Sequence, residues 1–260
     1  MYFTAQQLDE FKAARDGLSG RYRTLMEKYI MLPLSSPEAT EYARHGFARR
    51  LASLHHAVDR LFEVLPPDLE GIPNKAQLAD ASAFIQNALV HVYGCLDNLA
   101  WLWVKEAGIK KANGADLPAS HIGLRPSNTE VVSSLSENFQ AELSALIEWF
   151  DYVDDYRHAL AHRIPLYIPP YSVLEADAAT YHDHGAAIGD ALTAQDWDAM
   201  DEHEAAQEAL KTFRPQIFHS LSTTKKSMVF HAQLLADFAT VEKIGLLMLE
   251  EIESRGSNAG

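Results

Sequence analysis

The feature that most constrains the fold is a long segment, about 75–105, that is apolar nearly all round when placed on a helix. Such a helix is stable in water only where other elements cover it. Its most apolar stretch, 84–104, has the length of a membrane span, but it carries polar side chains at Gln86, Asn87, His91, Asp97 and Asn98. These polar groups favour a buried core helix over a membrane span. The segment therefore predicts the central helix of a bundle, and no membrane partner is expected.

Several polar positions of this segment share one face of the helix. Asn87, His91, Gly94 and Asn98 follow the helical repeat and form one stripe. Because buried polar groups need hydrogen-bond partners, another polar element must face the stripe.

Helical periodicity recurs along the rest of the chain, whereas runs that alternate with period two are nearly absent. Further helices are predicted over about 5–29, from Ser36-Pro37-Glu38 up to Pro66, and from about 128 to 162. The Ser-Pro-Glu start combines an N-cap residue with proline at the first helical position. Residues 108–127 are expected to form a loop, and the proline-rich residues 164–171 an extended segment. The predicted fold class is all-α.

A single domain is expected over residues 1–255. An acidic, alanine-rich insert at about 175–208 is predicted to form short exposed helices, and a C-terminal helix is predicted over about 225–253. Residues 256–260 are expected to be a disordered tail. The second predicted helix is the most basic stretch of the chain, with Arg50 near the edge of its apolar face; these charges are interpreted as facing solvent.

Composition excludes some classes of function. The 260 residues carry a formal net charge of -14, which argues against an extended non-specific nucleic-acid surface but permits a small anion site. The single cysteine, Cys95, excludes an intrachain disulfide or a thiolate metal cluster. The first residues show no secretory signal, so a cytoplasmic location is expected.

The segment from Asp154 to Arg163 is the densest in groups that move protons or hold phosphate. Within it, Arg157 and His162 are five positions apart, which on a helix means roughly 140° of rotation and about 7.5 Å of rise. A bent arginine stem would let both side chains grip one anion. A neutral His162 could accept a proton from a ribose 2′-hydroxyl while Arg157 stabilises charge on the phosphoryl oxygens. The pair is suited to metal-independent transesterification, which leaves a 2′,3′-cyclic phosphate and a 5′-hydroxyl.

The sequence from Arg157 to His162, at a helix end before Pro165, resembles the Arg-x4-to-6-His signature of the HEPN superfamily. The resemblance covers about 51–171 and implies a HEPN-like antiparallel helical bundle, here with extra C-terminal helices. Many members are metal-independent endoribonucleases of toxin–antitoxin, anti-phage and CRISPR systems. It also implies that Arg157 and His162 are catalytic, supported by Asp97 or Asn98. Family members often carry asparagine directly after the arginine; His158 takes that place here.

The resemblance further implies a homodimer that acts on RNA or a nucleotide, with a protein such as an antitoxin as a possible partner. No cofactor is expected. A HEPN-like scaffold that binds a nucleotide, RNA or a protein without cleavage is the alternative.

Other interpretations of the same residues stay open. Arg157 is also placed for a helical ion pair with Asp154, and His162 for a favourable position at a helix C-terminus. A metal site is a third possibility, because His158 and His162 have the i, i+4 spacing and Asp154 extends their stripe. A second metal-like cluster, His182-Asp183-His184-Gly185, is interpreted as a surface loop.

The polar groups of the central helix link these interpretations to the fold. We expect Asp97 and Asn98 to be satisfied by the segment 157–162, since an unpaired buried group costs roughly 1 to 3 kcal/mol.

Overall fold

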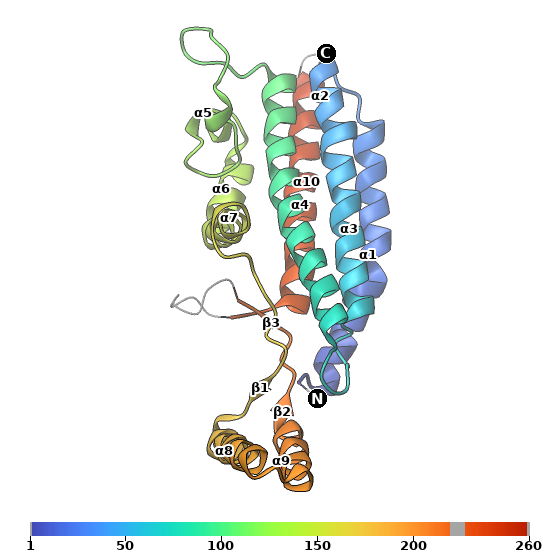
Figure 1. Ribbon diagram of the computed structural model, residues 1–260. Coiled ribbons are helices and arrows are strands. Elements are labelled where there is room, and N and C mark those ends of the chain that lie inside the picture. Colours follow the sequence, from blue (N-terminus) through green and yellow to red (C-terminus); the bar gives the residue numbers. More distant parts are fainter. Residues whose placement is uncertain (1, 219–226, 259–260) are drawn as a thin grey trace.

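Four long helices lie side by side and form the core of the protein (Figure 1). The computed structural model describes residues 2–218 and 227–258. The four helices are α1 (Ala5–Met31), α3 (Ala48–Val64), α4 (Lys75–Ala107) and α10 (Phe230–Asn258). Helix α4 packs against both α3 and α10 and contributes a large share of the buried apolar residues. The predicted all-α class and the central position of the 75–105 segment are confirmed.

The last helix, which lies outside the segment of the expected HEPN-like core, runs in the same direction as α4. Helices α1, α4 and α10 run the same way, and only α3 runs in the opposite direction (Figure 1). A long connection, 108–229, leaves one end of α4 and returns to the other end before α10 begins. Because of this return, α10 lies parallel to α4, and Arg255 near its end donates to the carbonyl of Ala107 at the end of α4.

Local signals set the limits of these helices. Asn74 and Gln77 form a capping box at the start of α4, and Gly108 ends the helix with a left-handed conformation, φ 65°. Ser36 caps α2 (Pro37–Glu41), as its sequence predicts, by accepting from the backbone N–H of Ala39.

A π-helix interrupts the second predicted helix. The π-helical segment η1 (Tyr42–Phe47) lies between α2 and α3, where the sequence predicts one uninterrupted helix. It brings the backbone at Gly46 so close to α4 that a Cβ there would lie 2.4 Å from Asn98 Oδ1. Glycine is therefore required at this contact.

The segment predicted as helical from about 128 to 162 is divided into three helices. They are α5 (Thr129–Val132), α6 (Glu137–Ala145) and α7 (Ile147–His162); a short 3-10 turn, η2 (Ala119–His121), precedes them. Helix α7 packs on α4 and crosses the bundle, so that Figure 1 shows it nearly end-on. The buried carboxylate of Asp237 in α10 holds α7 by accepting from Trp149 Nε1 (2.9 Å) and Tyr152 Oη (3.3 Å).

The acidic insert forms a helical hairpin that stands away from the bundle (Figure 1). Its helices are α8 (Ala178–Ala194), preceded by the turn η3 (Glu175–Asp177), and α9 (Trp197–Ala209). The two-residue strands β1 (Ser172–Val173) and β2 (Lys211–Thr212) pair at its base, and β3 (Gln216–Ile217) pairs with β4 (Met228–Val229) before α10. The predicted short helices are confirmed, but the loop predicted at 182–185 is wrong, because these residues lie inside α8.

The last helix is shifted towards the C-terminus relative to its predicted range of about 225–253. Helix α10 begins at Phe230 and continues to Asn258, so residues 256–258 are helical where a disordered tail was expected. Residues 259–260 lie outside the described part of the chain.

Among residues 2–218 and 227–258, Gln195 is the non-glycine residue with a positive φ. It ends α8 with φ 58°, a left-handed conformation that glycine adopts without steric cost. We expect Gln195→Gly to raise the free energy of unfolding by roughly 1 kcal/mol, measured by urea denaturation. Gln195→Ala keeps the Cβ and is expected to give no such gain; equal effects of the two variants would contradict this explanation.

Candidate functional site

The candidate site lies at the end of α7, where helix geometry separates a buried face from an exposed one. Phe150, Val153, Tyr156 and Ala159 recur with helical spacing and are buried. This face fixes α7 against the bundle. Arg157, His158 and His162 fall on the remaining surface, and all three are exposed.

The chain leaves the helix directly after His162. Arg163 still donates its backbone N–H to Ala159 at 3.0 Å, but its own conformation is extended, as expected shortly before Pro165. Leu166 and Ile168 are then buried and anchor the extended segment. The end of α7 is therefore held on both sides, which gives Arg157 and His162 a defined backbone.

Arg157 lies over an aromatic ring of α4. Its guanidinium carbon is 4.4 Å from the centroid of the Tyr93 ring, within the range of a cation–π interaction. Both residues line a cavity of about 470 Å³ that also reaches Asp97 and Asp154. Asp97 is the polar residue of α4 that the structure brings together with Arg157.

The environment of Asp97 is poorly solvated. Burial raises the pKa of its carboxyl to about 6, and the nearby guanidinium groups of Arg157 and Arg50 oppose this rise. A carboxylate in this position attracts Arg157 towards α4. It acts on the arginine through charge, as a positioning residue.

Asp154 forms an ion pair with an arginine other than Arg157. Arg125, in the loop after η2, forms ion pairs with Asp151 and Asp154. No ion pair between Asp154 and Arg157 occurs among residues 2–218 and 227–258. The alternative interpretation, in which Arg157 forms an ion pair with Asp154, is therefore wrong.

Asn98 lies away from the site, although it follows Asp97 directly. Its Oδ1 atom is buried against Gly46 of η1 and has no hydrogen-bond partner among the described residues. Consecutive residues on a helix point about 100° apart, so α4 turns Asn98 towards η1 and Asp97 towards α7. The expectation that the segment 157–162 satisfies Asn98 is wrong. Asp97 also has no hydrogen bond or ion pair to this segment among the described residues, and of this segment only the charge of Arg157 acts on it.

The two histidines of the motif are neighbours on the outer surface of α7. The ring centroids of His158 and His162 are 5.1 Å apart. Neither residue lines the cavity that Arg157 lines. Within one chain, the structure thus brings together Arg157 with Asp97, and His158 with His162.

The proposed metal clusters are not assembled. No group of three or more histidine, cysteine, aspartate or glutamate side chains is placed to hold a metal ion in the part of the chain that the structure describes. In the insert, His184 Nδ1 contacts His203 Nδ1 of α9 at 3.2 Å.

Three residues near the site were not singled out for it by sequence. Tyr93 is one turn before Asp97 on α4, so helical spacing alone could have linked them. Arg125 lies in a loop, where no periodicity indicates its partner. Arg50 reaches α4 from α3 and was interpreted as facing solvent.

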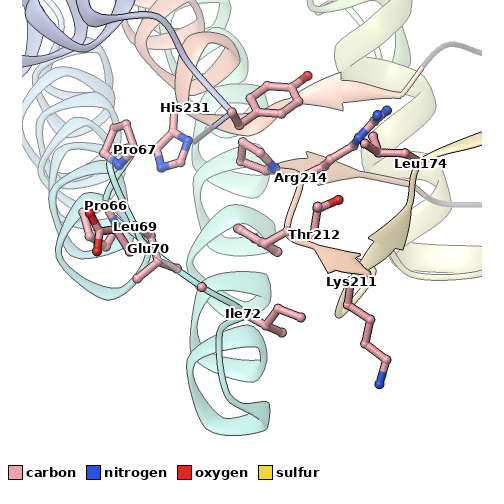
Figure 2. A pocket seen from close by; sticks show the side chains of 14 residues that line it. Pro66, Pro67, Leu69, Glu70, Ile72, Leu174, Lys211, Thr212, Arg214 and His231 are labelled. Carbon is pink, nitrogen blue, oxygen red and sulfur yellow. The ribbon is translucent and has the colours of Figure 1, made fainter. Parts of the chain in front are cut away.

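Figure 2 shows a larger cavity, whose lining includes Pro66, Arg214 and His231. Its volume is about 590 Å³, and it lies between the loop after α3, strand β2 and the start of α10. His231 lines it and is buried; its Nε2–H donates to the Leu65 carbonyl at 2.6 Å. Burial lowers the pKa of His231 to about 4, so this imidazole is neutral near pH 7 and plays a structural role.

Compared with protein-family models, curated proteins and solved structures, the chain gives no significant match. The resemblance to the HEPN superfamily therefore depends on the Arg157–His162 motif. Among the described residues, no helix is both long and apolar enough to cross a membrane.

Proposed function

We propose that the protein is a HEPN-like, metal-independent endoribonuclease that cleaves RNA by attack of the ribose 2′-hydroxyl on the adjacent phosphate. The proposal rests on the surroundings of the Arg157 guanidinium. This group is exposed, lies on the Tyr93 ring and has no ion pair with any carboxylate in the described part of the chain. An arginine held in place in this way, with its N–H donors unmatched, is suited to bind a phosphate group.

His162 supplies the proton transfer in this proposal. It is exposed on the last turn of α7, about one and a half helical turns from Arg157. Its imidazole takes the 2′-hydroxyl proton as the 2′-oxygen bonds to phosphorus. The bond from phosphorus to the 5′-oxygen breaks, and the departing oxygen takes a proton from water. Arg157 stabilises the charge on the non-bridging oxygens during this step. Asp97 positions Arg157 from beneath.

A homodimer would complete the site. Arg157 and His162 point to different parts of the surface in one chain, and pairing of two α7 ends would place one chain's arginine near the other's histidine. An isologous interface brings both motifs to its two-fold axis. The resemblance also implies a protein partner such as an antitoxin, and in this proposal that partner covers the surface at the end of α7.

A second function, RNA or nucleotide binding without cleavage, is favoured by one observation. Arg157 and His162 do not line a common cavity, and the cavity that Arg157 lines also contains Asp97 and Asp154. Asp154 is paired with Arg125, but the charge of Asp97 beside Arg157 weakens the attraction of this arginine for a phosphate.

The two functions are separated by a cleavage assay. Purified protein is incubated with a 5′-labelled single-stranded RNA in EDTA, and the products are resolved on a denaturing gel. We expect fragments ending in a 2′,3′-cyclic phosphate, and no cleavage of RNA in which every 2′-hydroxyl is methylated, since the nucleophile is then blocked. Binding of the RNA without any cleavage would support the second function and contradict the first.

A further inference from the structure

A separate cavity of about 740 Å³ opens between η1, the start of α3 and α4. In a chain with a net charge of -14 it gathers basic side chains. Arg49, Arg50 and Lys105 line it against Glu38 and Glu41, and the basic set is completed by two histidines, His45 and His91. The residues 157–162 are not part of it.

Arg50 enters this cavity over the backbone of α4. A Cβ at Gly94 would lie 2.3 Å from Arg50 Nη1 and 2.5 Å from its Cζ, so the guanidinium occupies the space that this glycine leaves open. Arg50 is half-buried, and no hydrogen bond or ion pair of its side chain occurs among the residues that the structure describes. A half-buried guanidinium with unmatched donors needs an acceptor.

Two further polar groups in the same cavity are also unmatched. His91 Nδ1 and Asn98 Oδ1 are buried, and neither has a hydrogen-bond partner within the described ranges. The two ends of an asparagine amide exchange places by a half-turn, so Asn98 can present N–H instead of oxygen. The side chains of Arg50, His91 and Asn98 come from two helices and line one space.

The backbone around these groups is unusual as well. The π-helix η1 contributes Gly46, which packs on Asn98, and such widened turns occur frequently at functional sites. On α4, Gly94 thus faces the guanidinium of Arg50, and Asn98 faces the π-helix η1. Neither contact supplies hydrogen-bond acceptors for Arg50. Asp97 of α4 is near enough for its charge to act on Arg50, but no hydrogen bond or ion pair joins the two side chains among the described residues.

We propose that this cavity is a binding site for the phosphate group of a small molecule. The guanidinium of Arg50 donates two parallel N–H bonds to phosphate oxygens, and His91 and Asn98 donate to the others. A tetrahedral oxyanion has enough acceptors for donors that arrive from α3 and α4, whereas a planar carboxylate offers only two oxygens. The site is distinct from Arg157 and His162, so it does not depend on RNA cleavage.

Calorimetric titration of the full chain tests this site at constant ionic strength. The probes are inorganic phosphate, ribose 5-phosphate and adenosine 5′-monophosphate, which distinguish free phosphate from phosphate carried by a small organic group. We expect at least one of them to bind, and Arg50→Gln to weaken its binding at least about tenfold. Arg44→Gln is the matched control: it removes the same charge from exposed η1 outside the cavity and is expected to change affinity less than about twofold.

Nuclear magnetic resonance on wild-type protein with ¹³C-labelled histidine gives a second readout that does not depend on how Arg50→Gln folds. The probe that binds should shift the ring signal of His91, assigned from His91→Gln, whether or not it also shifts that of His162. No binding of the three probes at millimolar concentration, equal affinity of wild type and folded Arg50→Gln, or a shift of His162 without His91 would each overturn the proposal. None of these results bears on the cleavage assay.

Discussion

Alanine at Arg157 or at His162 is expected to reduce the rate of RNA cleavage at least about 100-fold. His162 supplies the base that removes the 2′-hydroxyl proton, and Arg157 stabilises the charge that forms on the phosphoryl oxygens. Because the two groups act in one transition state, the double variant should be little slower than either single variant. Initial rates in EDTA, with RNA in excess, measure all three.

The exposure of both side chains makes this prediction specific to function. Arg157 and His162 bury little surface, so their replacement should leave the urea midpoint nearly unchanged. Two control variants remove a guanidinium and an imidazole from other helices. They are Arg23→Ala, at an exposed position of α1, and His184→Ala, in α8, and both should cleave RNA at the wild-type rate. Cleavage that persists in the Arg157→Ala, His162→Ala double variant would show that the proposed chemistry is not located here.

Asp237→Ala is expected to lower the free energy of unfolding by roughly 3 kcal/mol. The carboxylate is fully buried and accepts hydrogen bonds from Trp149 and Tyr152 of α7 and from Gln233 Nε2 at 2.8 Å. Alanine leaves these donors without an acceptor inside the protein. The loss should loosen α7 and with it the candidate site, measured by urea unfolding and by proteolysis within α7.

Asp237→Asn is the matched control, and it predicts a pH dependence. Burial raises the pKa of Asp237 to about 6, against about 3.9 for an unfolded aspartate, although its three hydrogen bonds act in the opposite direction. Between these values the folded state holds a proton that the unfolded state has lost. The contribution of Asp237 to stability is therefore fully present below about pH 4 and is lost as the pH rises through about 6.

Asparagine has nearly the same shape as aspartate but stays neutral. Asp237→Asn therefore removes the loss of stability that wild type shows as the pH rises through about 6. The asparagine Oδ1 can accept from Trp149 and Gln233, and its Nδ2 can donate to the Tyr152 hydroxyl. We expect Asp237→Asn to gain roughly 1 to 3 kcal/mol relative to wild type between pH 4.5 and pH 7.5. A difference between the two proteins that stays constant over this range would show that Asp237 is ionised throughout.

The order and type of the helices followed from local patterns. The N-cap at Ser36 and the apolar character of the segment that forms α4 are local properties, and both were recognised in the sequence. The divisions within 128–162 and the π-helix were not predicted. They depend on how the chain meets α4, as the close contact between Gly46 and Asn98 shows.

The sequence by itself determined an all-α protein with a buried central helix and a cluster of charged and titratable groups at the end of α7. These properties depend on the spacing of residues within single helices. Only the tertiary structure decided which polar side chains meet. It paired Asp154 with Arg125, left Arg157 beside Tyr93 and Asp97, and directed Asn98 towards Arg50's cavity. The physical reason is that neighbouring positions on a helix point about 100° apart, so their partners are set by which helices pack on each side.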